Sequence, residues 1–221
     1  EPIDSVRYIG NRSSGAMGFA LARRAAARGA DVTLVAANVA LEPPPGAELV
    51  PVSTAAQLGA ACEAAFDACD VLLMAAAVAD FRPRAPADGK LRKEHGVPSL
   101  EIEPTADVLA GLAARRRLDQ VLVGFAAEHG AGGVASARGK LERKRLDAIV
   151  VNDVSDAAIG FDAPDNEVTI LFAAGDDAQL ARASKEKIAD GVLDEVETLL
   201  VSKRESDDRA IGAGTARTTG E

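Results

Sequence analysis

A few short polar stretches, separated by apolar runs, carry the side chains that are best suited to chemistry. They offer one amide, one carboxylate and three lysines: Asn11, Asp80, Lys90, Lys140 and Lys144. Groups of these types can position a phosphate ester and stabilise the charge that develops as its bond breaks. The two histidines, His95 and His129, stand apart from each other, so neither a Ser-His-Asp triad nor a histidine metal site is expected. The inventory favours phosphate-ester chemistry.

The first polar stretch, residues 6–22, predicts a short strand, a tight turn and an alanine-rich helix. Glycines allow the sharp turn and the close approach of another group: Gly10, Gly15 and Gly18. Ser13 or Ser14 can cap the helix, whose first N–H groups would point into the loop. A helix start of this kind attracts anions, so Ser13, Ser14 and Gly15 are candidates for a phosphate or carboxylate site.

Two known glycine motifs fit this stretch imperfectly. The spacing of Gly10 and Gly15 is that of a P-loop, but Ala16-Met17 stands where Lys-Ser/Thr is required. The dinucleotide fingerprint requires a glycine where Arg12 stands, and no acidic residue closes the second strand after Val35. On the glycines alone, an ordinary strand-to-helix turn explains the stretch equally well.

Composition indicates a globular α/β protein with a small-residue core. Of the 221 residues, 48% are hydrophobic and 3% aromatic, and the net charge of −9 argues against nucleic-acid binding. The two cysteines, Cys62 and Cys69, lie in apolar surroundings and are expected to be reduced in a cytoplasmic protein. No run is long enough for a membrane span or a signal peptide. Because the chain starts in what resembles a linker, we expect it to be part of a longer polypeptide.

Apolar strands alternate with helical segments, a pattern that predicts a doubly wound, Rossmann-like, mostly parallel sheet with helices on both faces. The strands expected in that sheet span residues 31–37, 49–52, 70–77, 120–125 and 147–151. Residues 167–183 predict an appended β-hairpin. A final helix is expected at about 185–202. The chain thus divides into an ordered domain, 1–202, and a disordered tail, 203–221.

The loops after parallel strands meet at one edge of the sheet, where ligands usually bind. Asp80 follows the strand that ends in the small residues Ala75, Ala76 and Ala77, although a turn-forming aspartate is the simpler alternative. Lys90 lies in a proline- and glycine-rich segment, residues 83–98, which is interpreted as a mobile loop. Lys140 and Lys144 share one helix face and could clamp a polyphosphate. Solvated charges are the default interpretation of both lysine groups.

Taken together, these stretches resemble the phosphopantothenate–cysteine ligase family in its bacterial, CTP-using form. The resemblance extends from Asp4 to about Leu200. Its motifs, in order, are VRYIGNRSSGAMG at 6–18, AAAVADFR at 75–82, KLRK at 90–93, and GFAAE at 124–128 with Lys140, Lys144 and Asn152-Asp153. Four motifs in register are far more specific than any one alone.

The resemblance implies a two-step ligase reaction. The carboxylate of 4′-phosphopantothenate attacks the α-phosphate of CTP, giving an acyl-cytidylate and pyrophosphate. The amine of L-cysteine then attacks the activated carbonyl and releases CMP. Mg²⁺ would accompany the triphosphate, with Asp80 as a possible ligand. The family further implies a homodimer with shared sites and a flavin-dependent decarboxylase domain fused before this one.

The family's residue roles carry over by motif match. Asn11 would hold the acyl phosphate, Lys90 would lie on a flap over the intermediate, and Arg7 would reach across the dimer interface. Ser13, Ser14 and Gly15 would bind the substrate phosphate or neighbouring anions, and Ala76, Ala77 and Asp80 would line the reacting centre. The residues implied around the nucleotide are Ala75, Asp80, Lys90, Ala106, Asp107, Val108, Leu109, Phe125, Lys140 and Lys144.

The chain departs from the family pattern at Ala16 and Arg92, where lysines are common, and at His129, where threonine is common. Arg12 is a candidate replacement for the phosphate contact at position 16. Two other functions remain as alternatives. One is an NAD(P)-dependent oxidoreductase, against which the imperfect fingerprint argues. The other is a non-enzymatic nucleotide-binding domain, which a fold alone does not distinguish from an enzyme.

Overall fold

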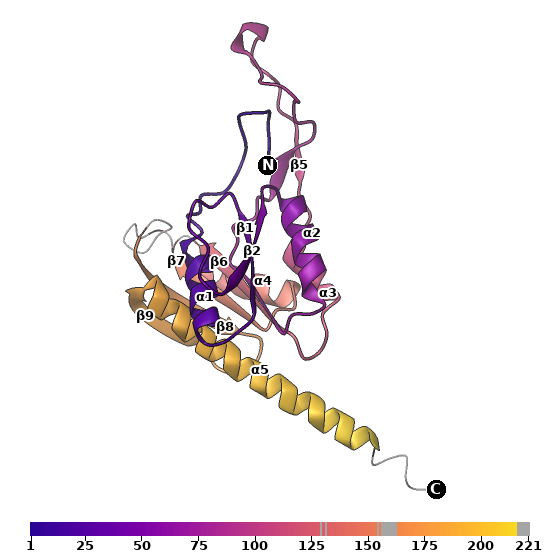
Figure 1. Cartoon of the computed structure of the whole chain (residues 1–221), viewed down its shortest axis with the longest axis vertical. Coiled ribbons are helices and arrows are strands. Elements are labelled where there is room, and N and C mark those ends of the chain that lie inside the picture. The colour runs from indigo at the N-terminus through magenta and orange to yellow at the C-terminus, as the bar shows by residue number, and fades with distance from the viewer. Residues whose placement is uncertain (129, 131, 154, 156–162, 216–221) are drawn as a thin grey trace.

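The structure is a computed structural model that describes residues 1–128, 130, 132–153, 155 and 163–215. His129, one of the two histidines considered above, lies outside the described residues. The chain folds into a layered α/β domain from which a narrow arm projects at one end and a long helix at the other (Figure 1).

The central sheet has five strands in the order β3-β6-β7-β8-β9. Strands β3 (Val71–Met74), β6 (Val121–Glu128) and β7 (Ala148–Asp153) are parallel to one another. Strands β8 (Asp165–Phe172) and β9 (Ala178–Ser184) form an antiparallel hairpin that extends this sheet. The predicted hairpin and the parallel core are therefore confirmed.

A separate parallel pair, β1 (Val32–Ala37) and β2 (Ala47–Val52), completes the doubly wound pattern. Within the described residues this pair is not hydrogen-bonded to β3. The helix that follows, α2 (Ala55–Phe66), starts directly after Thr54, because Thr54 and Gln57 form a reciprocal capping box.

Helices cover both faces of the sheet, as the sequence predicts. Helices α1 (Ala16–Ala27) and α5 (Lys185–Thr215) pack on one face through Leu21, Ile188 and Val192. Helices α2, α3 (Val108–Ala114) and α4 (Gly133–Arg143) cover the other face. The core on that side is built from the following residues: Leu58, Phe66, Leu112, Leu122 and Leu141. Aliphatic side chains fill both layers, and Phe66 is the largest residue that is fully buried.

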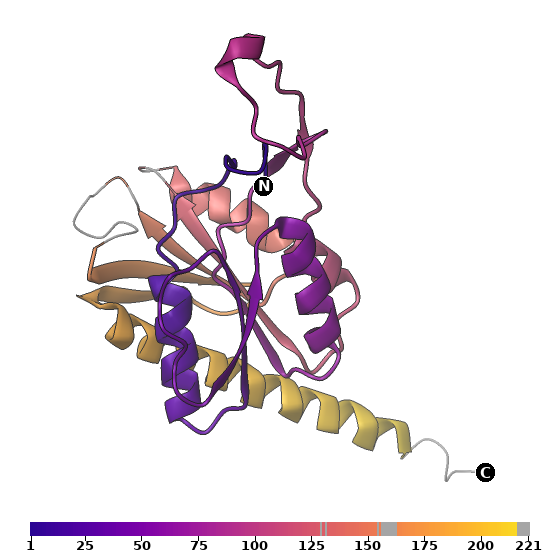
Figure 2. The same cartoon turned by 45° about the horizontal axis from the view of Figure 1, so that its top comes forward.

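The arm rises from the edge at which the parallel strands end. Its base is a two-stranded ribbon of β4 (Phe81–Pro83) and β5 (Ile102–Pro104), and its tip contains a single 3₁₀ turn at Lys93–His95. The ribbon and the loop beyond it stand clear of the domain in both views (Figures 1 and 2). Lys90 therefore lies on a projecting loop, at the place that the sequence indicated.

The short strand predicted near the start of the chain is not formed, and the reason is a local hydrogen-bonded turn. Residues 6–9 do not form a strand and make one isolated bridge, between Pro2 and Tyr8, because the Asp4 carboxylate binds the N–H groups of Val6 and Arg7 and folds the chain into a turn. Helix α3 is capped by Asp107, whose side chain accepts the Ala110 N–H at 3.1 Å, and Thr105 before it donates its N–H to the Asp80 carbonyl.

The expected tail at 203–221 is also corrected in part. Helix α5 continues through Thr215, and residues 216–221 lie outside the described residues. Lys203 explains why the helix does not end at Ser202. Its ammonium lies 2.8 Å from a carboxylate oxygen of Asp147 and donates to the Gln120 carbonyl at 2.8 Å. These polar contacts hold the helix where its apolar stripe has ended.

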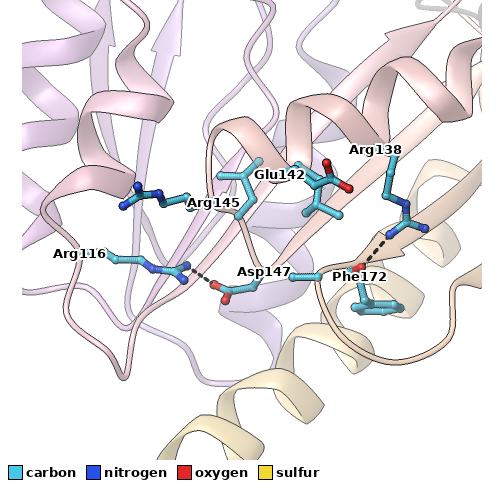
Figure 3. Close-up of a pocket in the computed structure, with 9 residues that line it drawn as sticks. Arg116, Arg138, Glu142, Arg145, Asp147 and Phe172 are labelled. Carbon is cyan, nitrogen blue, oxygen red and sulfur yellow. Dashed lines mark hydrogen bonds and ion pairs between the residues drawn. The ribbon is translucent and has the colours of Figure 1, made fainter.

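Asp147 also binds the guanidinium of Arg116 at 2.8 Å, beside a hollow of about 320 Å³ (Figure 3). Arg138, on the same hollow, donates to the Phe172 carbonyl and to Asp177. This hollow lies where β7 begins, which is the sheet edge opposite the arm. Because two of its guanidinium groups already bind carboxylates, it holds the ends of the elements together.

Candidate functional site

The site begins with Asp4, a buried carboxylate that accepts five hydrogen bonds. The donors are the N–H groups of Val6, Arg7 and Leu91 at 2.8, 2.7 and 3.1 Å, and the Arg7 guanidinium at 3.0 and 2.6 Å. Burial alone would raise the pKa of this carboxyl, but the hydrogen bonds hold the pKa well below its usual range. Asp4 is therefore ionised and joins the first segment of the chain to the arm.

Arg7 completes this junction. Its Nη2 atom donates to the Leu91 carbonyl at 2.6 Å as well as to Asp4, so both polar groups of the Leu91 backbone are engaged. Lys90 immediately precedes the anchored residue. The anchoring fixes the root of the Lys90 loop over the edge where β3 and β6 end.

Asn11 lies at the same edge. Its Nδ2 atom donates to the carbonyl of Val78 at 2.9 Å and to that of Ala77 at 3.4 Å. The amide is exposed and lies against the backbone that follows β3, and no donor in the described part of the chain binds its oxygen. The residue that neither glycine motif explains is thus brought to the small residues predicted to line the reacting centre.

Beside Asn11 is a hollow of about 110 Å³. It is lined by the turn before α1, by the ends of β3, β6 and β7, and by the starts of β8 and α5. The lining residues are Ser13, Ser14, Gly15, Ala16, Met17, Gly18, Ala75, Ala76, Ala77, Phe125, Ala127, Val150, Asn152, Asn166, Val168 and Lys185. Among them are one cation, two amides and no carboxylate.

The turn that forms one wall requires glycine at position 15. Gly15 has a φ of 73°, and a Cβ there would lie 2.7 Å from a methyl carbon of Val39. The serine hydroxyls accept from the turn itself, Ser13 from the Gly15 N–H at 3.3 Å and Ser14 from the Ala16 N–H at 3.4 Å. Gly15 is the capping residue of α1 and has no side chain to cap it, so the predicted serine cap is wrong, and the serine hydroxyls bond within the turn instead.

A second cluster gathers on the other face of the sheet. Lys144 binds the Asp107 carboxylate at 2.9 Å, and Lys140 binds Glu128 at 2.6 Å. These pairs bring α4 beside the start of α3, where Ala106, Asp107, Val108 and Leu109 lie. The expected nucleotide residues from two distant parts of the sequence are therefore neighbours.

Asp80 lies between the two clusters, because the Asp80 carbonyl accepts the Thr105 N–H at 3.0 Å just before residues 106–109. Within the described residues, no three His, Cys, Asp or Glu side chains form a group that could hold a metal by themselves. A single carboxylate still suits Mg²⁺, which usually combines one or two carboxylates with substrate phosphates.

Sequence reasoning missed two residues that line the hollow, Asn166 and Lys185. Asn166 is the second residue of the apolar strand β8 and is buried, and Lys185 is the first residue of α5. The sequence offered one indication of their role, which is that each lies at the start of a predicted element leading away from the sheet edge. No helix in the described part of the chain is long and apolar enough to cross a bilayer.

Comparison with known families gives one match that spans most of the chain. The model of the family described as DNA/pantothenate metabolism flavoprotein C-terminal domain matches residues 1–200. Among curated relatives, the coenzyme A biosynthesis bifunctional protein CoaBC of Mycobacterium tuberculosis is 46% identical over 210 residues, and that of Bacillus subtilis 42% over 205. Each alignment covers 90% of this chain but only 50% and 49% of the relative, so the chain spans about half their length.

Solved structures give the same fold. The crystal structure of the C-terminal domain of a CoaBC protein is 34% identical with a TM-score of 0.76, and the match covers 91% of both chains. A mutant of Cab2, solved in complex with phosphopantothenate-cysteine, has a TM-score of 0.75 at 17% identity, covering 94% of this chain and 85% of that one. At 17% identity the second likeness concerns the fold alone.

The Asp4 junction predicts a pH-dependent stability. Because its pKa is depressed in the folded state, the stabilisation is fully present above the ordinary pKa of about 3.9 and is lost as the pH falls toward the folded-state value. Asp4→Asn should therefore be less stable than the parent at pH 7, by a margin that narrows at pH 3. Urea midpoints at both pH values measure this. An equal difference in urea midpoint between parent and variant at both pH values would contradict the assignment. Asp88→Asn serves as the control.

Proposed function

The chain belongs to the family of DNA/pantothenate metabolism flavoprotein C-terminal domains, and on that premise we propose that it joins 4′-phosphopantothenate to L-cysteine as a CTP-dependent ligase of coenzyme A biosynthesis. The observation that carries the proposal is the pairing of two sites across the ends of β3 and β6. A carboxylate-free hollow beside Asn11 suits an anionic acyl substrate, and the lysines of α4 suit a triphosphate.

In the first step, the substrate carboxylate attacks the α-phosphate of CTP and pyrophosphate leaves. Ser13, Ser14 and Gly15 would bind anionic groups of the acyl substrate, and the small residues Ala75, Ala76 and Ala77 would let it lie against backbone. Asn11, already held by the Val78 carbonyl, would present its amide to the acyl phosphate. Positioned donors of this kind stabilise charge that develops during the reaction.

In the second step, the amine of L-cysteine attacks the activated carbonyl, and CMP leaves with the bonding electrons. Lys90 would close over the acyl-cytidylate from the arm, with its loop root fixed by Asp4 and Arg7. Closing a cationic loop over a mixed anhydride keeps water from hydrolysing it.

The nucleotide would lie on the other face. Lys140 and Lys144 would exchange Glu128 and Asp107 for the triphosphate, while residues 106–109 would surround the base and ribose. Phe125, which the resemblance implied near the nucleotide, instead lines the hollow on the opposite face. Mg²⁺ would bind through the triphosphate with Asp80 as its protein ligand, and when bound it neutralises phosphate charge. The free thiols Cys62 and Cys69 fit the expected cytoplasmic setting.

We also propose that the enzyme is a homodimer, fused in its full-length form to a flavin-dependent decarboxylase domain. Exposed apolar side chains gather on the first segment and the arm, and a second copy would cover them: Val6, Tyr8, Phe81, Val97, Leu100 and Ile102. Arg7 is half-exposed beside this surface, although it binds Asp4 of its own chain.

The direct test of the proposed function measures pyrophosphate release with CTP, 4′-phosphopantothenate and L-cysteine. Release should require the acyl substrate and should fall at least tenfold when ATP replaces CTP. NADH oxidation with the same substrates tests the oxidoreductase alternative and should be absent. If no nucleotide supports pyrophosphate release, the ligase proposal fails and a non-enzymatic binding domain is favoured.

Lys140→Gln should raise the KM for CTP by about tenfold, the effect of losing one charge-assisted phosphate contact. The KM for 4′-phosphopantothenate should change by less than about twofold. The control is Arg143→Gln, which removes an exposed cation from the same helix. Equal effects of the two substitutions on the KM for CTP would show that only the general charge of α4 matters.

The dimer is tested by light scattering. The parent should have twice the chain mass, and Ile102→Glu on the exposed ribbon should shift it toward the single-chain mass and reduce turnover. Leu118→Glu is the matched control, because Leu118 is 84% exposed and lies at the opposite edge of the sheet. A parent that is monomeric at micromolar concentration would rule out the proposed dimer.

A further inference from the structure

The inner end of the hollow is built by Asn166 and Lys185, to which nothing above gives a role. Both lie at the start of an element, Asn166 in β8 and Lys185 in α5, and both line the hollow together with the turn before α1. Across the hollow, Ala77 lies beside Asn11, the residue assigned to the reacting centre. The hollow therefore has two chemically different ends.

Asn166 is a buried amide whose hydrogen-bonding capacity is only half used. Its residue is 6% exposed, and its oxygen accepts the Glu167 N–H at 3.0 Å. Among the described residues, its Nδ2 atom has only the Met17 sulfur as a partner, at 4.0 Å. Buried amide nitrogens normally donate to oxygen or nitrogen, so this side chain is short of an acceptor on the side that faces the hollow.

Lys185 supplies the charge. Its Nζ atom donates to the Ala163 carbonyl and its N–H to the Pro164 carbonyl at 3.2 Å, so the ammonium is held at the start of α5. Among the described residues that line the hollow, it is the only cationic side chain, and none of them is acidic. This part of the lining therefore favours an anionic group.

Two helix starts reinforce this charge. Helices α1 and α5 run in the same direction, as their ion pairs show: Arg23 with Glu186, Arg24 with Asp190, and Arg28 with Asp194 and Glu197. Both helices begin beside the hollow, because their first residues, Ala16 and Lys185, line it. The positive ends of two helix dipoles repel each other, and an anion bound between them is attracted to both.

We propose that Asn166 and Lys185 bind the phosphate monoester of the acyl substrate and thereby select phosphorylated over unphosphorylated pantothenate. This inference rests on the proposed function, whose acyl substrate occupies the same hollow. It also orients that substrate, with the phosphate at the inner end and the carboxylate toward Asn11. The opposing assignment, a nucleotide phosphate at this end, is an outcome of the test.

The test compares binding by calorimetry of 4′-phosphopantothenate, pantothenate and CTP, each alone, to the parent and to Lys185→Met and Asn166→Asp. Lys185→Met should weaken 4′-phosphopantothenate about tenfold and leave pantothenate and CTP within about twofold. Asn166→Asp, which places a carboxylate in the hollow, should weaken it further. The control Lys187→Met removes an exposed cation two residues along α5 and should bind all three as the parent does.

Several results would overturn the proposal. One is an equal loss for pantothenate and 4′-phosphopantothenate, and another is a loss for CTP alone, which would assign this end to the nucleotide. Retained CTP binding shows that a variant is folded. If Asn166→Asp does not fold, Lys185→Met alone is sufficient to test the proposal. A parent that binds 4′-phosphopantothenate through these residues but releases no pyrophosphate would refute the ligase and leave the phosphate site standing.

Discussion

The candidate site depends on one buried carboxylate. Asp4 gathers donors from its own turn and from Leu91 on the arm, two segments that no strand pairing joins. A buried charge with this many donors stays ionised and is costly to separate from them. The attachment of the Lys90 loop to the first segment of the chain depends largely on that ion.

The two faces of the sheet carry different parts of the candidate site. The face covered by α1 and α5 forms the carboxylate-free hollow, and the face covered by α3 and α4 carries the paired lysines. Between them lie the ends of β3 and β6, where the residues are small: Ala75, Ala76, Ala77 and Gly124. A Cβ at Gly124 would come within 2.8 Å of Leu146, so no larger residue is accommodated there. Substrates bound on the two faces would meet across this thin layer.

Much of this could be predicted from the sequence, because apolar periods and caps are local. The parallel strands and the hairpin followed from spacing alone. The strand expected at residues 6–9 failed because a carboxylate outside the pattern, Asp4, captured its N–H groups. The end of α5 was misplaced because Lys203 is held by Asp147, which is distant in sequence. Asn166 and Lys185 were not predicted as site residues, because they line the hollow only through the packing of β8 and α5 beside the turn before α1.

Helix α5 runs across the domain, from the hollow to the opposite edge of the sheet. One end carries Lys185 into the hollow, and farther along Lys203 is fixed to Asp147 at the opposite edge of the sheet. Because an α-helix is stiff along its axis, the contacts of Lys203 help to fix the position of the Lys185 ammonium near the other end of the helix. Little conformational freedom is left to lose when an anion arrives. A substrate phosphate bound as proposed would therefore meet a charge whose position is set before binding.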